Sequence, residues 1–144
     1  MKNQNTQKLL LECDAGVKMA ISSINEVMKK DGDLKLHSIL RASIEQHQKL
    51  EKELAALLAE YNIPENEPSP LAKGMSWMKT NMKLSMDNSN GIVADLITDG
   101  CNMGIKSLYK YLNQYKDADE SSRKITEKLI SIEEKLKKEL QEYL

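Results

Sequence analysis

The chain has 144 residues, of which 40% are apolar and only 4% aromatic, with no phenylalanine. This length predicts a single domain over residues 1–144 that buries a core of leucine, isoleucine, methionine and valine. The 21 basic and 22 acidic residues leave a formal net charge of −1, which excludes the basic field that would hold nucleic acid or an anionic membrane.

The start of the chain lacks the apolar segment of a signal peptide, because its run of three leucines ends at Glu12. No apolar stretch approaches the roughly 20 residues that a helix needs to cross a bilayer. Cys13 and Cys101 form no CxxC pair, and without an export signal we expect both to be reduced thiols. These features predict a cytoplasmic protein that binds neither membranes nor nucleic acid.

Two long amphipathic helices are predicted first, over residues 6–30 and 34–61, because apolar residues recur there at spacings of three and four. Between them, Gly32 ends one helix and Asp33 caps the next. The stripe of the second helix comprises Leu36, Leu40, Ser43, His47, Leu50, Leu54, Leu57 and Tyr61. Its centre is polar, and burying those groups without partners would cost about 1–3 kcal/mol for each.

A shorter helix is predicted over residues 70–86, where Pro70 occupies the first helical position. We interpret its methionines as adaptable packing groups rather than copper ligands. Two more long helices follow over residues 92–116 and 120–143, and no strand pattern appears in the sequence. The last helix has a predicted aliphatic stripe of Ile125, Leu129, Ile132, Leu136 and Leu140, with Tyr143 at its end. The predicted fold class is therefore all-α: a four-helix bundle of two antiparallel hairpins, joined by a crossover that contains the short helix.

The layout resembles the ferritin-like superfamily, in particular small bacterial proteins related to rubrerythrins. The stretches that carry this resemblance are LLLECDAGVKMAISSI, HQKLEKELAALLAEYNIP, MSWMKTNMKL and LITDGCNMGIKSLYKYLNQY. It implies a ferritin-like four-helix bundle with a di-iron carboxylate site, in which two helices each provide a Glu and the other two each provide Glu-x-x-His. The chain departs from that set, because Ile44 stands three residues before His47 and the last helix contains no histidine.

Several polar residues are predicted to share one level of the bundle. Asp14 lies 18 residues before Gly32 and His47 lies 15 after it, which places both within roughly 5 Å along the hairpin axis. The predicted buried layer, with Lys18 at its edge, comprises Cys13, Asp14, Ser43, His47, Glu51, Asp95, Asp99, Cys101 and Asn102.

Four members of this layer, His47, Asp14 and the two cysteines, each have a structural and a functional interpretation. His47 is either a core histidine bonded to Asp14 or to a backbone carbonyl, or a metal ligand or proton-transfer group. Asp14 forms a buried ion pair with Lys18 or His47, or binds metal. The two cysteines act as small buried apolar groups, or complete a zinc site with His47 and Asp14.

Asp95 and Asp99 lie one helical turn apart and repel each other unless a cation is near. A lysine at position 79, 83 or 106 would provide that cation, and so would a metal. We favour lysine. The best metal-ligand candidates are nevertheless Asp14, His47, Asp95 and Asp99.

The sequence contains no recognisable catalytic set, and we do not expect an enzyme. The favoured hypothesis is a ferritin-like bundle without the di-iron site, which needs no cofactor and acts as a binding or interaction protein, with a homodimer as one form. The alternative is a protein that binds iron, manganese or zinc, or an oxidoreductase, with an altered site around Asp14 and His47.

Overall fold

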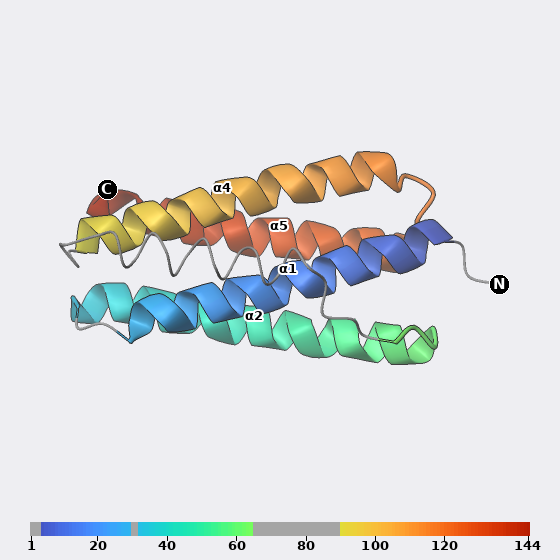
Figure 1. Cartoon of the computed structure of the whole chain (residues 1–144), viewed down its shortest axis with the longest axis horizontal. Coiled ribbons are helices and arrows are strands. Elements are labelled where there is room, and N and C mark those ends of the chain that lie inside the picture. Colours follow the sequence, from blue (N-terminus) through green and yellow to red (C-terminus); the bar gives the residue numbers. More distant parts are fainter. Residues whose placement is uncertain (1–3, 30–31, 65–89) are drawn as a thin grey trace.

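The computed structural model describes residues 4–29, 32–64 and 90–144. The helices in this part of the chain are α1 (Gln4–Met28), α2 (Leu34–Glu60), α4 (Asn90–Gln114) and α5 (Glu120–Leu140), and the 3-10 turn η1 (Gln141–Tyr143) follows α5 (Figure 1). All regular structure in these ranges is helical, which confirms the all-α prediction for them. The helix expected over residues 70–86, with its methionines, lies outside the described residues.

Hydrogen bonds at the two ends of the bundle define the directions of the helices. Asp33 N donates to Asn90 Oδ1 at 3.2 Å, so α2 and α4 begin at the same end. Asp119 N donates to Thr6 Oγ1 at 2.8 Å, so α1 and α5 begin at the opposite end. Both hairpins, α1 with α2 and α4 with α5, are therefore antiparallel, and the chain between α2 and α4 joins opposite ends of the bundle (Figure 1).

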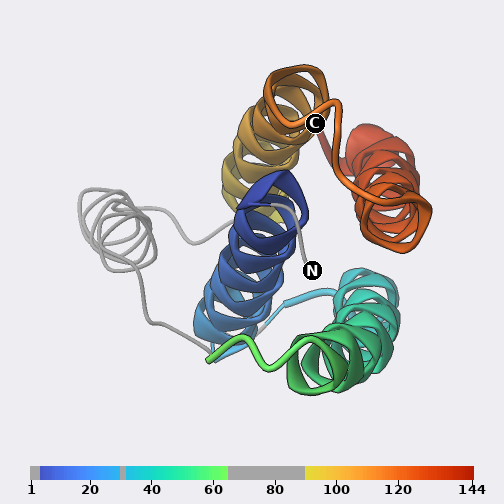
Figure 2. The ribbon, with the colours of Figure 1, turned by 90° about the vertical axis from the view of Figure 1, so that its right-hand side faces the viewer.

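The four helices bury one shared apolar core. Within the described chain, α1 packs against α2, α4 and α5, and α5 also packs against α2 and α4 (Figure 2). The largest fully buried aliphatic side chains of this core are Leu9, Leu10, Val17, Ile24, Leu36, Leu40, Leu50, Leu54, Leu58, Leu129 and Leu140. On α2, Leu58 is buried and Leu57 is only partly buried. Seven residues of a straight helix fall about 20° short of two full turns, so a stripe with heptad spacing drifts around the helix and the buried position moves from Leu57 to Leu58.

The core face of α5 differs from the predicted aliphatic stripe at one position. Glu133 is buried, whereas Ile132 is only partly buried. At 100° per residue, Glu133 lies about 40° from Leu129 on the side toward the centre of the buried face, and Ile132 lies about 60° away on the other side. A carboxylate therefore enters the core where the periodicity had suggested an isoleucine.

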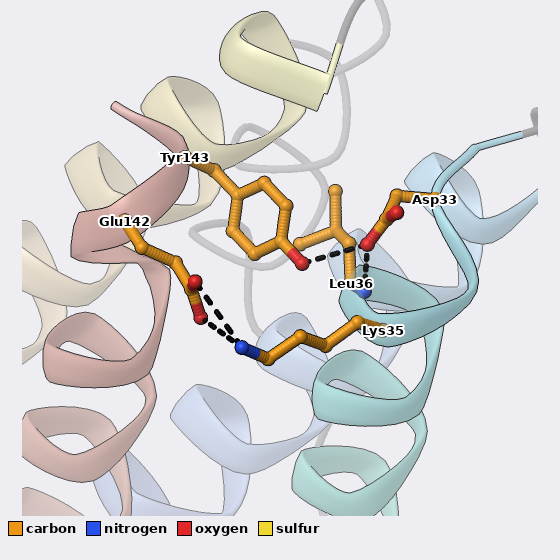
Figure 3. A network of polar contacts seen from close by, with 5 residues as sticks. All are labelled: Asp33, Lys35, Leu36, Glu142 and Tyr143. Atoms are coloured by element: carbon orange, nitrogen blue, oxygen red, sulfur yellow. Dashed lines mark hydrogen bonds and ion pairs between the residues drawn. The ribbon is translucent and has the colours of Figure 1, made fainter.

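An aspartate at one end of the bundle joins the N-terminus of α2 to the C-terminus of the chain (Figure 3). Asp33 is the N-cap of α2 and accepts from Leu36 N at 3.0 Å. Tyr143 donates its hydroxyl hydrogen to the same Asp33 carboxylate at 2.7 Å, and Lys35 forms an ion pair with Glu142 at 2.9 Å. The hydrogen bond to Asp33 raises the pKa of Tyr143 to about 12 and lowers the pKa of Asp33.

The opposite end repeats this arrangement with the roles of α2 and α5 exchanged. Asp119 is the N-cap of α5 and accepts from Ser122 N at 2.8 Å. Tyr61, directly after α2, donates its hydroxyl hydrogen to Asp119 Oδ2 at 2.5 Å. Each of these two antiparallel helices is therefore capped by an aspartate that a tyrosine from the end of the other helix contacts.

None of the helices in the described ranges combines the length and apolar character that crossing a lipid bilayer requires.

We expect Tyr61→Phe to lower the free energy of unfolding by about 1 kcal/mol at pH 7, because it removes a hydrogen bond to a carboxylate. Burial raises the pKa of Asp119, but the hydrogen bonds from Tyr61 and Ser122 outweigh burial and leave that pKa below its ordinary value of 3.8. A lowered pKa in the folded state contributes stability above 3.8 that is lost as the pH falls through the folded value. Urea unfolding curves should therefore converge for the wild type and the variant in acid.

The control for this prediction is Tyr109→Phe, because the Tyr109 side chain is 52% exposed. We expect no measurable change in stability from the control. Equal losses in both variants would contradict a stabilising role for the contact between Tyr61 and Asp119.

Candidate functional site

His47 lies at the centre of the core with no exposed surface. Its Nδ1 is 2.7 Å from the backbone oxygen of Ser43, one turn earlier on α2, and 3.3 Å from the Ser43 hydroxyl. A carbonyl oxygen only accepts hydrogen bonds, so Nδ1 carries the hydrogen in this contact. Of the interpretations considered for His47, the structure shows the bond to a backbone carbonyl.

The other ring nitrogen of His47 faces α5. His47 Nε2 is 3.6 Å from Glu133 Oε1, and it has no hydrogen-bond partner among the described residues. With Nδ1 protonated, a neutral imidazole presents a lone pair to the carboxylate, so both atoms are acceptors. One additional proton, on the imidazole or on the carboxyl group, makes the contact attractive.

Cys101 and Gly104 of α4 lie beside the contact between His47 and Glu133. Cys101 is 2% exposed, and burial, followed by the nearby charge of Glu133, raises the pKa of its thiol far above the ordinary value. A Cβ added to Gly104 would lie 3.6 Å from Glu133 Oε1, so the backbone of α4 passes close to the carboxylate. We call Ser43, His47, Cys101 and Glu133 the His47 cluster.

Asp14 has a separate partner. Its Oδ2 accepts from Lys18 Nζ at 2.7 Å, one turn along α1. The Asp14 side chain is 1% exposed and the Lys18 side chain is 21% exposed, so the ammonium group approaches the core from its edge. Of the two partners considered for Asp14, the structure selects Lys18 rather than His47.

Cys13 forms a second thiol contact, between α1 and α5. Its Sγ is 3.1 Å from Thr126 Oγ1, and that hydroxyl donates to Ser122 O at 2.8 Å. The thiol therefore donates to the threonine oxygen. Burial raises the pKa of Cys13 to about 12, so both cysteines are buried protonated thiols rather than nucleophiles.

The acidic part of the predicted layer lies elsewhere. Asp95, Asp99 and Asn102 are exposed, and Glu51 is partly exposed. At 100° per residue, Asp95, Asp99 and Asn102 point about 100–160° away from the seam that contains Cys101. The expectation that they join a buried layer with His47 is therefore wrong.

Glu133 is a core residue that the sequence pattern did not predict. Its signal was weak, because Glu133 belongs to the run Glu133-Glu134-Lys135 within a helix rich in Glu and Lys. On the helix, Glu133 lies at an angle close to that of Leu129 and Leu136, which favours burial. A buried carboxylate is unfavourable without a polar partner, however, and the partner His47 belongs to another helix.

No group of three or more His, Cys, Asp or Glu side chains within residues 4–29, 32–64 and 90–144 is arranged to hold a metal ion. Comparisons with protein families, with curated proteins and with solved structures give no match to this chain. The function is therefore inferred from the geometry of the chain itself.

We expect His47→Leu and Glu133→Leu to show strong coupling. Each single variant should lose about 3 kcal/mol of stability, because it leaves one buried polar group opposite an apolar side chain. The double variant should lose less than the sum of the two, by about 1 kcal/mol or more. Urea unfolding of all four proteins measures the coupling, and additive losses would show that the two side chains do not interact.

We expect Lys18→Met to destabilise the fold by about 3 kcal/mol at pH 7, since it leaves the buried Asp14 carboxylate without its ion-pair partner. Lys18→Met combined with Asp14→Leu should recover part of that stability, because the buried charge is then absent as well. Thermal unfolding of both proteins tests this, and no recovery in the double variant would show that Lys18 acts independently of Asp14.

Proposed function

We propose that this protein is a cytoplasmic, ferritin-like four-helix bundle that acts as a binding or interaction protein and holds no di-iron centre. Two features support the ferritin-like part of the proposal. The hairpins are antiparallel, and the chain between α2 and α4 joins opposite ends of the bundle, which is the single-crossover layout of ferritin-like folds.

The observation that carries the proposal is that basic groups of the chain itself face the buried carboxylates. Lys18 Nζ lies 2.7 Å from Asp14, and His47 Nε2 lies 3.6 Å from Glu133. In a di-iron protein, metal ions compensate the inward-facing carboxylates and the histidines bind those ions. Here Lys18 provides the positive charge beside Asp14, and one proton shared between His47 and Glu133 would compensate the second carboxylate without a metal ion.

The thiols of the core also support a role other than catalysis. Cys13 and Cys101 are buried, and the pKa of each is raised mainly by burial. A thiol in that state is a weak nucleophile and a weak metal ligand, because both functions require the thiolate. The chemistry of this interior is therefore that of packing and hydrogen bonding.

The alternative proposal is a metal-binding protein or oxidoreductase with an altered site. One observation favours it: His47 Nε2 is fully buried, lacks a hydrogen-bond partner within the described chain and faces a carboxylate. A divalent cation between His47 and Glu133 would take the place of the proton that makes their contact attractive, and the thiol of Cys101 would be a third candidate ligand. The two proposals predict different metal contents.

Elemental analysis of the purified protein, followed by titration with Fe²⁺, Mn²⁺ and Zn²⁺, separates them. We expect less than stoichiometric metal, and a thermal unfolding midpoint that neither a chelator nor added metal shifts, because a ligand that binds only the folded state raises stability. His37→Ala is the matched control for weak binding by the other histidine, which lies near the surface. One equivalent of metal that disappears in His47→Ala but remains in His37→Ala would overturn the proposal in favour of the alternative.

A further inference from the structure

The exposed face of α4 carries two acidic and two basic residues in a symmetric order. Asp95 and Asp99 lie in its first half, and Lys106 and Lys110 lie in its second half, all of them exposed. At 100° per residue the four side chains fall within about 60° of one another around the helix. They therefore form one stripe that is acidic at one end and basic at the other.

The spacing of this stripe is self-complementary. Residues 95 and 110 lie equally far from the point between Asn102 and Met103, and so do residues 99 and 106. If a second copy of α4 lies antiparallel to the first with a two-fold axis at that point, Asp95 faces Lys110 of the other copy and Asp99 faces Lys106. A two-fold interface requires this relation, in which residue i contacts j and j contacts i.

The charges of the stripe lack compensation within the described chain. None of the four residues forms an ion pair with another described residue. Asp95 and Asp99 are one turn apart and repel each other, and Lys106 and Lys110 do the same. Pairing with an antiparallel copy would relieve both repulsions at once, whereas a parallel copy would increase them.

Apolar groups lie at the centre and edge of the same face. Met103 is 59% exposed and Tyr109 is 52% exposed, and they are two of the four large apolar side chains exposed in the described chain. Met103 is next to the expected axis, where the two copies of this flexible side chain would meet. Among the described elements, α4 packs against α1 and α5 (Figure 2) and against η1, and the residues of the stripe remain exposed.

We propose that the protein forms a homodimer through this face, with two α4 helices packed antiparallel about a two-fold axis between Asn102 and Met103. The proposal rests on the function proposed above, because it names a second copy of the chain as the partner of the interaction protein. A net charge of −1 adds little long-range repulsion between copies. The exposed ion pairs make the dimer sensitive to salt.

Charge reversal tests the pairing. The variant Asp95→Lys/Asp99→Lys carries only basic groups on the stripe, and Lys106→Glu/Lys110→Glu carries only acidic ones. We expect each variant alone to have a dimer dissociation constant about tenfold or more above that of the wild type, by sedimentation equilibrium at low salt. An equimolar mixture should form heterodimers, because every pair is then oppositely charged, and combining the four substitutions in one chain should restore the homodimer.

Cysteine cross-linking locates the axis independently. Met103→Cys should form an intermolecular disulfide under mild oxidation, because the two copies of residue 103 lie beside the axis. Asp95→Cys is the matched control, since its two copies would lie about 22 Å apart along the helices. The native cysteines are buried and should not react in the folded dimer.

A monomeric wild type at all accessible concentrations, or a dimer that neither charge-reversed variant weakens, would overturn this proposal. Rapid cross-linking through position 95 alone would also overturn it. These outcomes leave the metal content unchanged, so they are distinct from a failure of the proposed function, which stoichiometric metal in the wild type would reveal whether or not the protein dimerises.

Discussion

The buried contact between His47 and Glu133 constrains the packing of α2 against α5. Both side chains lie in the core, and His47 Nε2 has no other partner among the described residues. Sliding one helix by a turn would place each polar group against aliphatic side chains, at the cost of a buried group without a partner. The two polar side chains therefore face each other in only one register of the two helices.

Hydrogen bonds at both ends of α2 and α5 form in this same register. Tyr61 reaches Asp119 at one end, and Tyr143 reaches Asp33 at the other. Each aspartate also caps a helix, so a single carboxylate joins a local role to a long-range one. Three polar contacts, at the middle and at both ends, thus hold α2 and α5 in place while the aliphatic core provides most of the burial.

The interior and the surface of this bundle use charge in different ways. Inside, Lys18 forms an ion pair with Asp14, and His47 faces Glu133 within the same chain. On α4, by contrast, the exposed charges have no partner in the described chain and follow an order that a second copy would complement. The proposed function rests on this difference between buried carboxylates that face basic groups of the same chain and exposed charges that face outward from α4.

The sequence by itself determined the positions of the long helices, the burial of His47 and Asp14, and the cap at Asp33, because helical periodicity and cap chemistry act over a few neighbouring residues. It also placed Lys18 within one turn of Asp14, a contact that needs no information from another helix. Only the tertiary structure showed that His47 faces Glu133 rather than Asp14, and that Asp95 and Asp99 lie outside the core. Those outcomes depend on how each helix is rotated and offset against its neighbours, where one residue is a change of about 100° around the axis. Packing of the whole core decides that rotation, so local patterns along the chain leave it undetermined.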